Sequence, residues 1–218
     1  MDCKIAANAE MQRMLNAMPG LRERKKQQTR DAIIRAAFRL FRKRGFDATT
    51  IVGIAEAADI SPRTFFSYFE SKEAVVFHDL DEVRAGLAAH LQQREPGQTT
   101  FDALRSWVDE SLEGFEARTR DRSERRELIR KTPALRDHEY ANHGVFERLI
   151  AESVAADLGV PADSLRPRMI AAAAVAALTA LDAMYGDEIP DDPMSVVDEA
   201  IGFLQGGLGA LQRKPARR

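Results

Sequence analysis

One short segment of the sequence carries side chains of the kinds that contact DNA. Arg63 presents a guanidinium, which can read a guanine through two parallel hydrogen bonds or hold a backbone phosphate. Thr64 can touch a base edge or a thymine methyl group, and the hydroxyls of Ser67 and Tyr68 suit phosphate oxygens. A helix is expected to begin at Lys72, so its ammonium and the free backbone N–H groups beside it can hold a phosphate together. This spacing predicts a surface that contacts both bases and phosphates.

Further residues extend this predicted surface on both sides. Thr49 and Thr50 are expected to contact the backbone of the same DNA strand, and Lys25 and Lys26 the adjacent groove or its phosphates. Contacts of this kind position a protein on DNA, whereas contacts to base edges determine which sequence it prefers. The full predicted DNA-contacting set is Lys25, Lys26, Thr49, Thr50, Ser61, Arg63, Thr64, Ser67, Tyr68 and Lys72.

Two short helices joined by a tight turn are predicted to position these side chains. Thr50 is suited to cap the first helix, and the turn follows at Asp59-Ile60-Ser61. Ser61 can cap the second helix, where Pro62 at the first position loses no hydrogen bond, and Ser71 can cap a third. A pair of helices with this connection is a helix-turn-helix, whose second helix can lie in the major groove.

Phenylalanines in the second helix divide its buried side from its exposed side. Phe65 and Phe69 are four residues apart and share a face, so both are expected in the core. Arg63, Thr64, Ser67 and Tyr68 are then left to face outward.

The segment from about Thr29 to Val76 resembles the DNA-binding domain of the TetR family of bacterial transcriptional regulators. The resemblance lies in Leu40-Phe41-Arg42-Lys43-Arg44-Gly45-Phe46, in the run from Thr50 through Ala58, and in the run from Ser61 through Lys72. Asp59 stands where the family commonly has Gly, and Phe66 where Tyr is usual. The resemblance implies a regulator that acts as a dimer, most commonly by blocking a promoter, and that binds a small molecule in its second domain.

Charge and helical patterning agree with a two-part, all-α chain. Residues 21–72 carry 12 Lys and Arg against 6 Asp and Glu, whereas residues 73–218 carry 18 against 26. A basic module beside an acidic one suggests phosphate contact at one end only, although charged helices can also simply solvate themselves. We expect an N-terminal arm (1–20), a three-helix DNA-binding domain with the helix-turn-helix (21–72), a helical ligand-binding and dimerisation domain (73–211) and a basic tail (212–218).

Apolar periodicity and helix breakers predict where the helices lie. The first is expected over 26–44, ended by Gly45 in a left-handed cap, and a long one over 71–93. After a break at 95–97, helices are expected from about 101, on either side of Pro133, over 163–185 and over 194–211.

Apolar residues of the middle helices are candidates to line a pocket for a small apolar or amphipathic ligand, although ordinary core is the simpler interpretation for each one. They are Phe101, Leu104, Trp107, Val108, Leu112, Phe115, Phe146, Leu149 and Met169. The arginines 122, 125, 126 and 130 could meet an anionic ligand, but a solvated face is the simpler interpretation. Residues 130–136 resemble actinobacterial members of the family, some of which sense acyl-CoA esters.

The last two helices are the predicted dimer interface. The run from Met169 to Leu181 is rich in Ala, and Gly202, Gly206 and Gly209 offer further small surfaces, so helices can approach closely. Packing within a single chain is the alternative. A symmetric dimer would read a palindromic double-stranded DNA operator. The 13-residue apolar run is too short to cross a bilayer, and no signal peptide precedes it, so a cytoplasmic protein without membrane contact is expected.

Two other classes of protein are alternatives to a regulator. A metal-dependent enzyme is suggested by His138 and His143, but histidines five apart on a helix point to different faces, unlike the four-residue spacing of a zinc motif. The single cysteine, Cys3, provides no zinc site, so no cofactor or metal is expected. A DNA-architectural protein without an inducer is the second alternative, and it would bind many sequences about equally.

Overall fold

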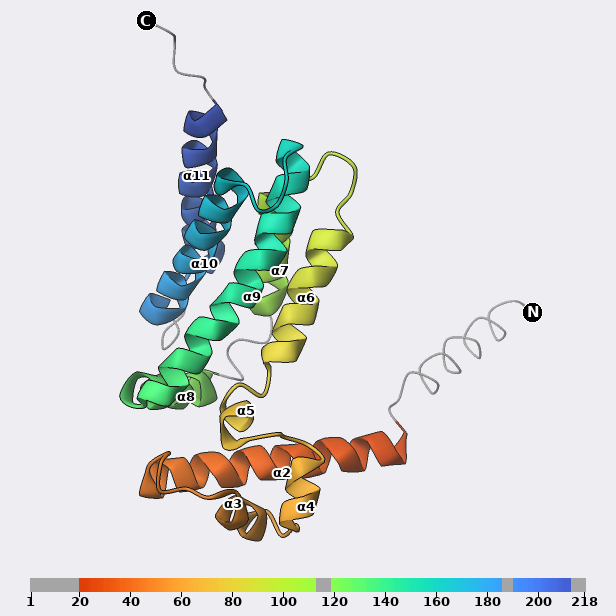
Figure 1. The fold of residues 1–218 in the computed structure, drawn as a ribbon, viewed down its shortest axis with the longest axis vertical. Helices are drawn as coiled ribbons and strands as arrows, with labels where there is room; N and C mark the ends of the chain where they lie inside the picture. Colours follow the sequence, from red (N-terminus) through yellow and green to blue (C-terminus); the bar gives the residue numbers. More distant parts are fainter. Residues whose placement is uncertain (1–19, 113–118, 186–189, 213–218) are drawn as a thin grey trace, which may run out of the picture. The chain divides into compact units, whose positions relative to one another are not determined.

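The computed structural model describes residues 20–112, 119–185 and 190–212, and over these residues the chain is helical and contains no strand (Figure 1). The all-α fold class is therefore confirmed. The helices are α2 (Leu21–Arg44), α3 (Ile51–Ala57), α4 (Pro62–Phe66), α5 (Lys72–Val76), α6 (Leu80–Gln92), α7 (Thr100–Leu112), α8 (Thr119–Lys131), α9 (Pro133–Leu158), α10 (Leu165–Tyr185) and α11 (Pro193–Gln212).

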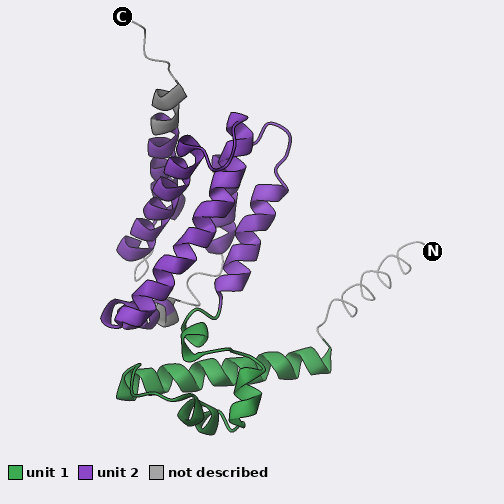
Figure 2. Ribbon diagram, viewed as in Figure 1, with its two compact units in different colours: residues 1–78 green, residues 79–218 purple. Residues whose placement is uncertain are grey.

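The chain divides into two compact units between His78 and Asp79, six residues beyond the predicted boundary at 72 (Figure 2). The long helix expected over 71–93 is in fact two helices, α5 and α6, separated by residues 77–79. Helix α5 belongs to the first unit, because Val75 and Val76 are fully buried there and Arg30 of α2 donates a hydrogen bond to the carbonyl of His78. Most of the predicted arm and tail lies outside the described residues.

Side-chain caps and buried rings hold the short helices of the first unit. The hydroxyls of Thr50, Ser61 and Ser71 accept hydrogen bonds from the third backbone N–H after each, at 3.1, 3.0 and 3.1 Å, as predicted. Helices of five to seven residues are not stable alone, so tertiary burial must supply the rest. Phe65 is fully buried and Phe69 nearly so, which confirms their predicted place in the core.

Two turns of the first unit require unusual backbone angles. Gly45 ends α2 at φ 81° and ψ 165°, so the predicted left-handed helical cap is wrong, although the positive φ still favours glycine. Asp59, in the turn between α3 and α4, has φ 56° and is the one non-glycine residue with positive φ in the described part of the chain. The predicted helix-turn-helix is present, with a strained residue at its turn.

In the second unit, α6, α7, α9 and α10 surround one apolar core (Figure 1). Its buried residues are Leu87, Leu91, Phe101, Ala103, Leu104, Ile150, Ala151, Val154, Ile170, Ala171, Ala174 and Val175. Helix α11 packs on this core through Ile201 and Leu204. A bidentate ion pair between Arg105 of α7 and Asp198 of α11 also joins the two helices.

A polar junction orders the start of α7. Asp157 of α9 accepts hydrogen bonds from the backbone N–H and the hydroxyl of Thr100, at 2.7 and 2.6 Å, and pairs with Arg94 at 2.5 Å. Burial raises the pKa of Asp157, but the hydrogen bonds from Thr100 and Arg94 outweigh it and hold that pKa below its ordinary value. Thr99 and Asp102 cap the helix reciprocally, and this holds the pKa of Asp102 low as well.

Candidate nucleic-acid interface and ligand cavity

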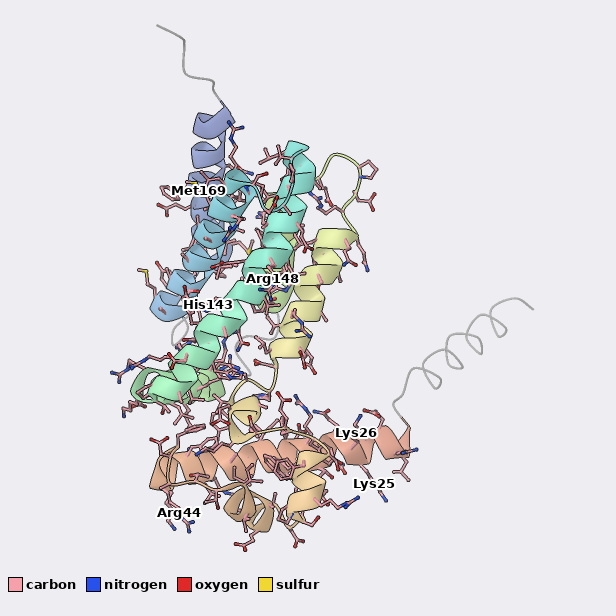
Figure 3. The ribbon with its side chains drawn as sticks, viewed as in Figure 1. Lys25, Lys26, Arg44, His143, Arg148 and Met169 are labelled. Atoms are coloured by element: carbon pink, nitrogen blue, oxygen red, sulfur yellow. The ribbon has the colours of Figure 1, made fainter. Side chains whose placement is uncertain are left out.

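A basic groove of about 590 Å³ lies in the first unit, between the start of α2 and the end of α4. It brings together four of the predicted DNA-contacting residues, namely Lys25, Lys26, Ser67 and Tyr68. Figure 3 shows Lys25 and Lys26 near the N-terminal end of α2, at the opposite end of that helix from Arg44. The rest of the lining is Arg22, Glu23 and Thr29, so cations outnumber the single carboxylate and the groove suits a polyanion.

Helix α4 presents an exposed polar face next to this groove. Arg63 is exposed, and the hydroxyl of Ser67 donates to its carbonyl oxygen at 3.2 Å. The hydroxyls of Ser61 and Thr64 lie 2.8 Å apart at the exposed start of the helix. Thr50 is likewise exposed, at the start of α3, where its hydroxyl caps the helix. These side chains are accessible for the contacts predicted for them.

Two members of the predicted set point inward instead. The ammonium of Lys72 donates to the carbonyl oxygens of Phe46 and Thr49, at 2.8 and 3.2 Å, and lies 4.2 Å from the centre of the Phe46 ring. Thr49 is only 2% exposed, and its hydroxyl donates to the carbonyl of Gly45 at 2.7 Å. The phosphate contacts predicted for these two side chains are therefore corrected. Both side chains donate their hydrogen bonds to carbonyl oxygens of the loop after α2, and they hold that loop in place.

Two exposed apolar side chains of this region were missed by sequence reasoning. Phe66 is 56% exposed and Val52 53% exposed, although both residue types are usually buried. The exposure of Phe66 could have been predicted from the spacing, because Phe66 follows Arg63 by three residues and shares its face of the helix.

The second unit contains a cavity of about 220 Å³. Its wall consists of Val83, Trp107, Val108, Ser111, Leu112, Arg122, Leu178, Leu181, Asp182, Tyr185, Pro190, Pro193, Val196 and Val197. Trp107 is the single tryptophan of the chain. Its indole lies against α6 at Gly86, where an added Cβ would come within 3.4 Å of the ring nitrogen.

The predicted pocket residues divide between this wall and other places. Trp107, Val108 and Leu112 line the cavity. The others do not: Phe101 and Leu104 are buried in the core, Phe146 and Leu149 pack against it, Met169 (labelled in Figure 3) is 48% exposed on α10, and Phe115 lies outside the described residues. Helical periodicity marks an apolar side chain as inward-facing but does not separate a packed core from a cavity wall.

Arginines of α8 form ion pairs within the second unit. Arg122, in the cavity wall, pairs with Asp182 of α10 at 2.7 Å, and Arg126 approaches the same carboxylate at 3.5 Å. Arg125 pairs at 2.6 Å with Asp79, the first residue of the unit. All three arginine side chains are at most 30% exposed, so the solvated face considered for them is wrong and only Arg130 is exposed.

Helices α10 and α11 leave a broad apolar surface uncovered. Leu165, Met184 and Phe203 are 73%, 72% and 79% exposed. Helix α10 has 21 residues and extends beyond the 13-residue apolar run, so the prediction that this segment is too short for a bilayer is wrong. By length and composition it could cross a membrane, with a mean hydropathy of 1.4 and only 22% of that window buried.

Among the residues that the structure describes, no group of three or more His, Cys, Asp and Glu side chains could hold a metal ion. His138 and His143 both lie on α9.

Comparison with known proteins identifies the class of the chain. Residues 33–78 match the family model described as bacterial regulatory proteins of the tetR family, and residues 98–209 match the model of the MftR C-terminal domain. The chain is 35% identical over 163 residues to the HTH-type transcriptional regulator TcmR of Streptomyces glaucescens, covering 71% of each chain. It is 28% identical over 187 residues to MftR of Mycobacterium tuberculosis, covering 86% of this chain and 92% of that one.

A solved structure supports the same assignment. The TetR-family repressor FadR of Thermus thermophilus, in complex with lauroyl-CoA, is 27% identical with a TM-score of 0.52, covering 87% of this chain and 98% of that one. The protein is thus a helix-turn-helix transcriptional regulator. It belongs to the TetR family, as the resemblance of its DNA-binding segment implied.

Proposed function

We propose that this regulator is a cytoplasmic repressor that binds a palindromic operator as a homodimer and is released by a small apolar or amphipathic inducer. The observation that supports it most is the division of roles between the units. The first unit has a basic groove beside an exposed helix of a helix-turn-helix, and the second has an apolar cavity.

On DNA, α4 would enter the major groove with Arg63 and Thr64 directed at base edges. Lys25, Lys26, Ser67 and Tyr68 line one groove, so they would follow the phosphates beside it. Thr50 and Ser61 would contribute hydroxyls at the exposed starts of α3 and α4. Thr49 and Lys72 would act indirectly, by fixing the loop that carries Thr50.

A second copy of the chain would cover the exposed faces of α10 and α11. The apolar residues there include Leu165, Met184 and Phe203, and an added Cβ at Gly202 or Gly206 would meet nothing within 4 Å. Large exposed apolar patches mark interaction surfaces, and small residues let helices approach closely. We infer that this surface meets protein rather than lipid, because the chain belongs to a family of transcriptional regulators.

The inducer would occupy the cavity of the second unit. The FadR relative binds lauroyl-CoA, which supports a ligand site in a protein of this architecture. Helix α8 connects the cavity to the first residue of the second unit, because it holds both Arg122 in the wall and Arg125, the partner of Asp79. A ligand that prefers one position of α8 would then shift the population between DNA-binding and released states.

The DNA part of the proposal is tested by gel shift with operators selected from random duplexes. Arg63→Ala should weaken binding to the selected site by about 1–3 kcal/mol and relax its sequence preference. Arg130→Ala removes an exposed arginine of the second unit and serves as the matched control. Unchanged affinity and preference in Arg63→Ala would contradict the assignment. Equal binding to selected and random DNA across a range of salt would instead identify a DNA-architectural protein.

The dimer is tested by sedimentation at micromolar concentration. The unaltered protein should sediment with twice the mass of its 24.3 kDa chain, and Phe203→Glu should reduce it to the monomer mass. Gln92→Glu adds the same charge at an exposed position of α6, outside this surface, and should leave the dimer intact. A monomer mass for the unaltered chain would refute this part of the proposal.

A further inference from the structure

The size, the lining residues and the charge of the cavity in the second unit restrict what can bind there. From them we propose that its ligand is a compact, uncharged aromatic molecule whose hydroxyl or amide group joins the Arg122–Asp182 ion pair. This inference rests on the proposed function, in which the cavity holds the inducer, and adds the chemical class of that inducer.

The volume limits the number of rings. An engineered apolar cavity of about 150 Å³ holds benzene. The cavity here measures about 220 Å³, which leaves room for roughly one further fused ring. Drug-sized sites are usually larger, at roughly 300–1,000 Å³. The part of the ligand that lies inside the cavity is therefore a small ring system.

The wall favours a flat and rigid ligand. Apart from Ser111, Arg122 and Asp182, every residue that lines the cavity is apolar or aromatic. Trp107 lies against α6 at Gly86, where an added Cβ would be in ordinary van der Waals contact with the indole, so the ring is packed on that side and forms an aromatic face of the wall. Aromatic pairs gain about 0.5–1.5 kcal/mol beyond area burial through stacked or edge-to-face geometry. A rigid ring loses little conformational entropy when it binds such a face.

The ion pair determines the charge that the ligand can carry. Asp182 lies 2.7 Å from Arg122 and 3.5 Å from Arg126, so the guanidinium in the wall already has a carboxylate as its partner. A ligand carboxylate would have to displace Asp182 or lie beside it, and like charges at that separation repel each other. A ligand ammonium would likewise be repelled by the two arginines. A full charge of either sign on the ligand therefore meets a like charge at this end of the cavity.

A neutral group that both donates and accepts can join the pair without breaking it. A guanidinium has five N–H donors and a carboxylate about four acceptor sites, so each can bond a ligand in addition to its partner. A hydroxyl or primary amide would accept from Arg122 and donate to Asp182. Hydrogen bonds to charged groups are among the stronger ones, which gives the pair a role in ligand selection.

Three probes with the same ring system test the proposal on the unaltered, full-length protein by equilibrium dialysis. These are 2-naphthol, which donates and accepts, 2-naphthoate, which is anionic, and naphthalene, which has no polar group. We expect 2-naphthol to bind at least tenfold more tightly than either of the others. A preference for 2-naphthoate, or equal binding of naphthalene and 2-naphthol, would overturn the proposal.

An isosteric variant then tests the role of the ion pair. Asp182→Asn removes the negative charge and leaves Arg122 and Arg126 without that carboxylate, so the preference should shift toward 2-naphthoate by tenfold or more. Asp191→Asn removes a carboxylate from an exposed position outside the wall and should leave the preference unchanged. An unchanged preference in folded Asp182→Asn would overturn the assignment, and the three-probe comparison needs no variant if that protein fails to fold.

Gel shifts with the same probes separate this inference from the proposed function. If 2-naphthol binds with the expected preference but releases no DNA at saturation, the inducer role fails and the ligand class stands. If DNA is released only by the anionic probe, the ligand class fails and the inducer role stands.

Discussion

Lys25 offers a quantitative test of the basic groove, because a phosphate contact has a known salt signature. Lys25 lies in the groove with Ser67 and Tyr68, and its side chain is exposed. In a symmetric dimer, Lys25→Ala removes two phosphate contacts. Each contact contributes about 0.9 to the slope of log affinity against log salt concentration, so the slope should become shallower by about 1.8.

The expected change is large enough to measure by fluorescence anisotropy with a labelled operator duplex. Between about 50 and 200 mM salt, the unaltered protein should lose roughly tenfold more affinity than Lys25→Ala does. The effect should be the same on every DNA sequence, because phosphates carry no sequence information.

Lys131→Ala is the matched control. This lysine is exposed, lies on α8 of the second unit and pairs with Glu127 at 2.6 Å. Its removal should leave the salt slope unchanged. If Lys25→Ala also left the slope unchanged, the groove would not be a phosphate-binding surface.

Further predictions concern the junction and turns that hold the fold. Asp157→Ala should lower the free energy of unfolding by about 2–4 kcal/mol, as measured by denaturant titration. The reason is that the buried N–H of Thr100 loses its hydrogen-bond acceptor and Arg94 loses the carboxylate with which it pairs. The pKa of Asp157 is below its ordinary value of 3.8, so the stabilisation is fully present above about pH 4 and is lost as the pH falls further; Asp157→Asn should flatten this acid limb in thermal melts. Gly45→Ala should destabilise the first unit by about 1–3 kcal/mol, whereas Asp59→Gly should stabilise it by up to about 1 kcal/mol; opposite signs would show that the positive φ angles do not carry strain.

Local signals explain which features of the first unit could be predicted. A cap such as Thr50 or Ser61 depends on residues within the next turn of chain, so the sequence contains the whole interaction. Lys72 is different, because its carbonyl partners lie 23 to 26 residues earlier in the chain. The break between α5 and α6 could not be predicted from the sequence either, because residues 77–79 contain neither Gly nor Pro, the usual helix breakers.

In the second unit the sequence predicted which side chains face inward but not whether each lies in the packed core or in the cavity wall. Phe101 and Trp107 both carry the apolar pattern of α7, yet one lies in the core and the other in a cavity wall. That difference depends on the side chains that other helices bring to each position. The pairing of Arg122 with Asp182, 60 residues away, is equally a product of packing.

The composition of α10 has a consequence for newly made protein. Where its surface is uncovered, many of its side chains are alanines, including Ala172, Ala173, Ala176 and Ala180. Each exposes a single methyl group, so a chain that has not yet met its partner shows water far less hydrocarbon than a leucine-rich helix would. Alanine at these positions thus lowers the tendency of an unpartnered chain to aggregate, at the expense of a weaker association.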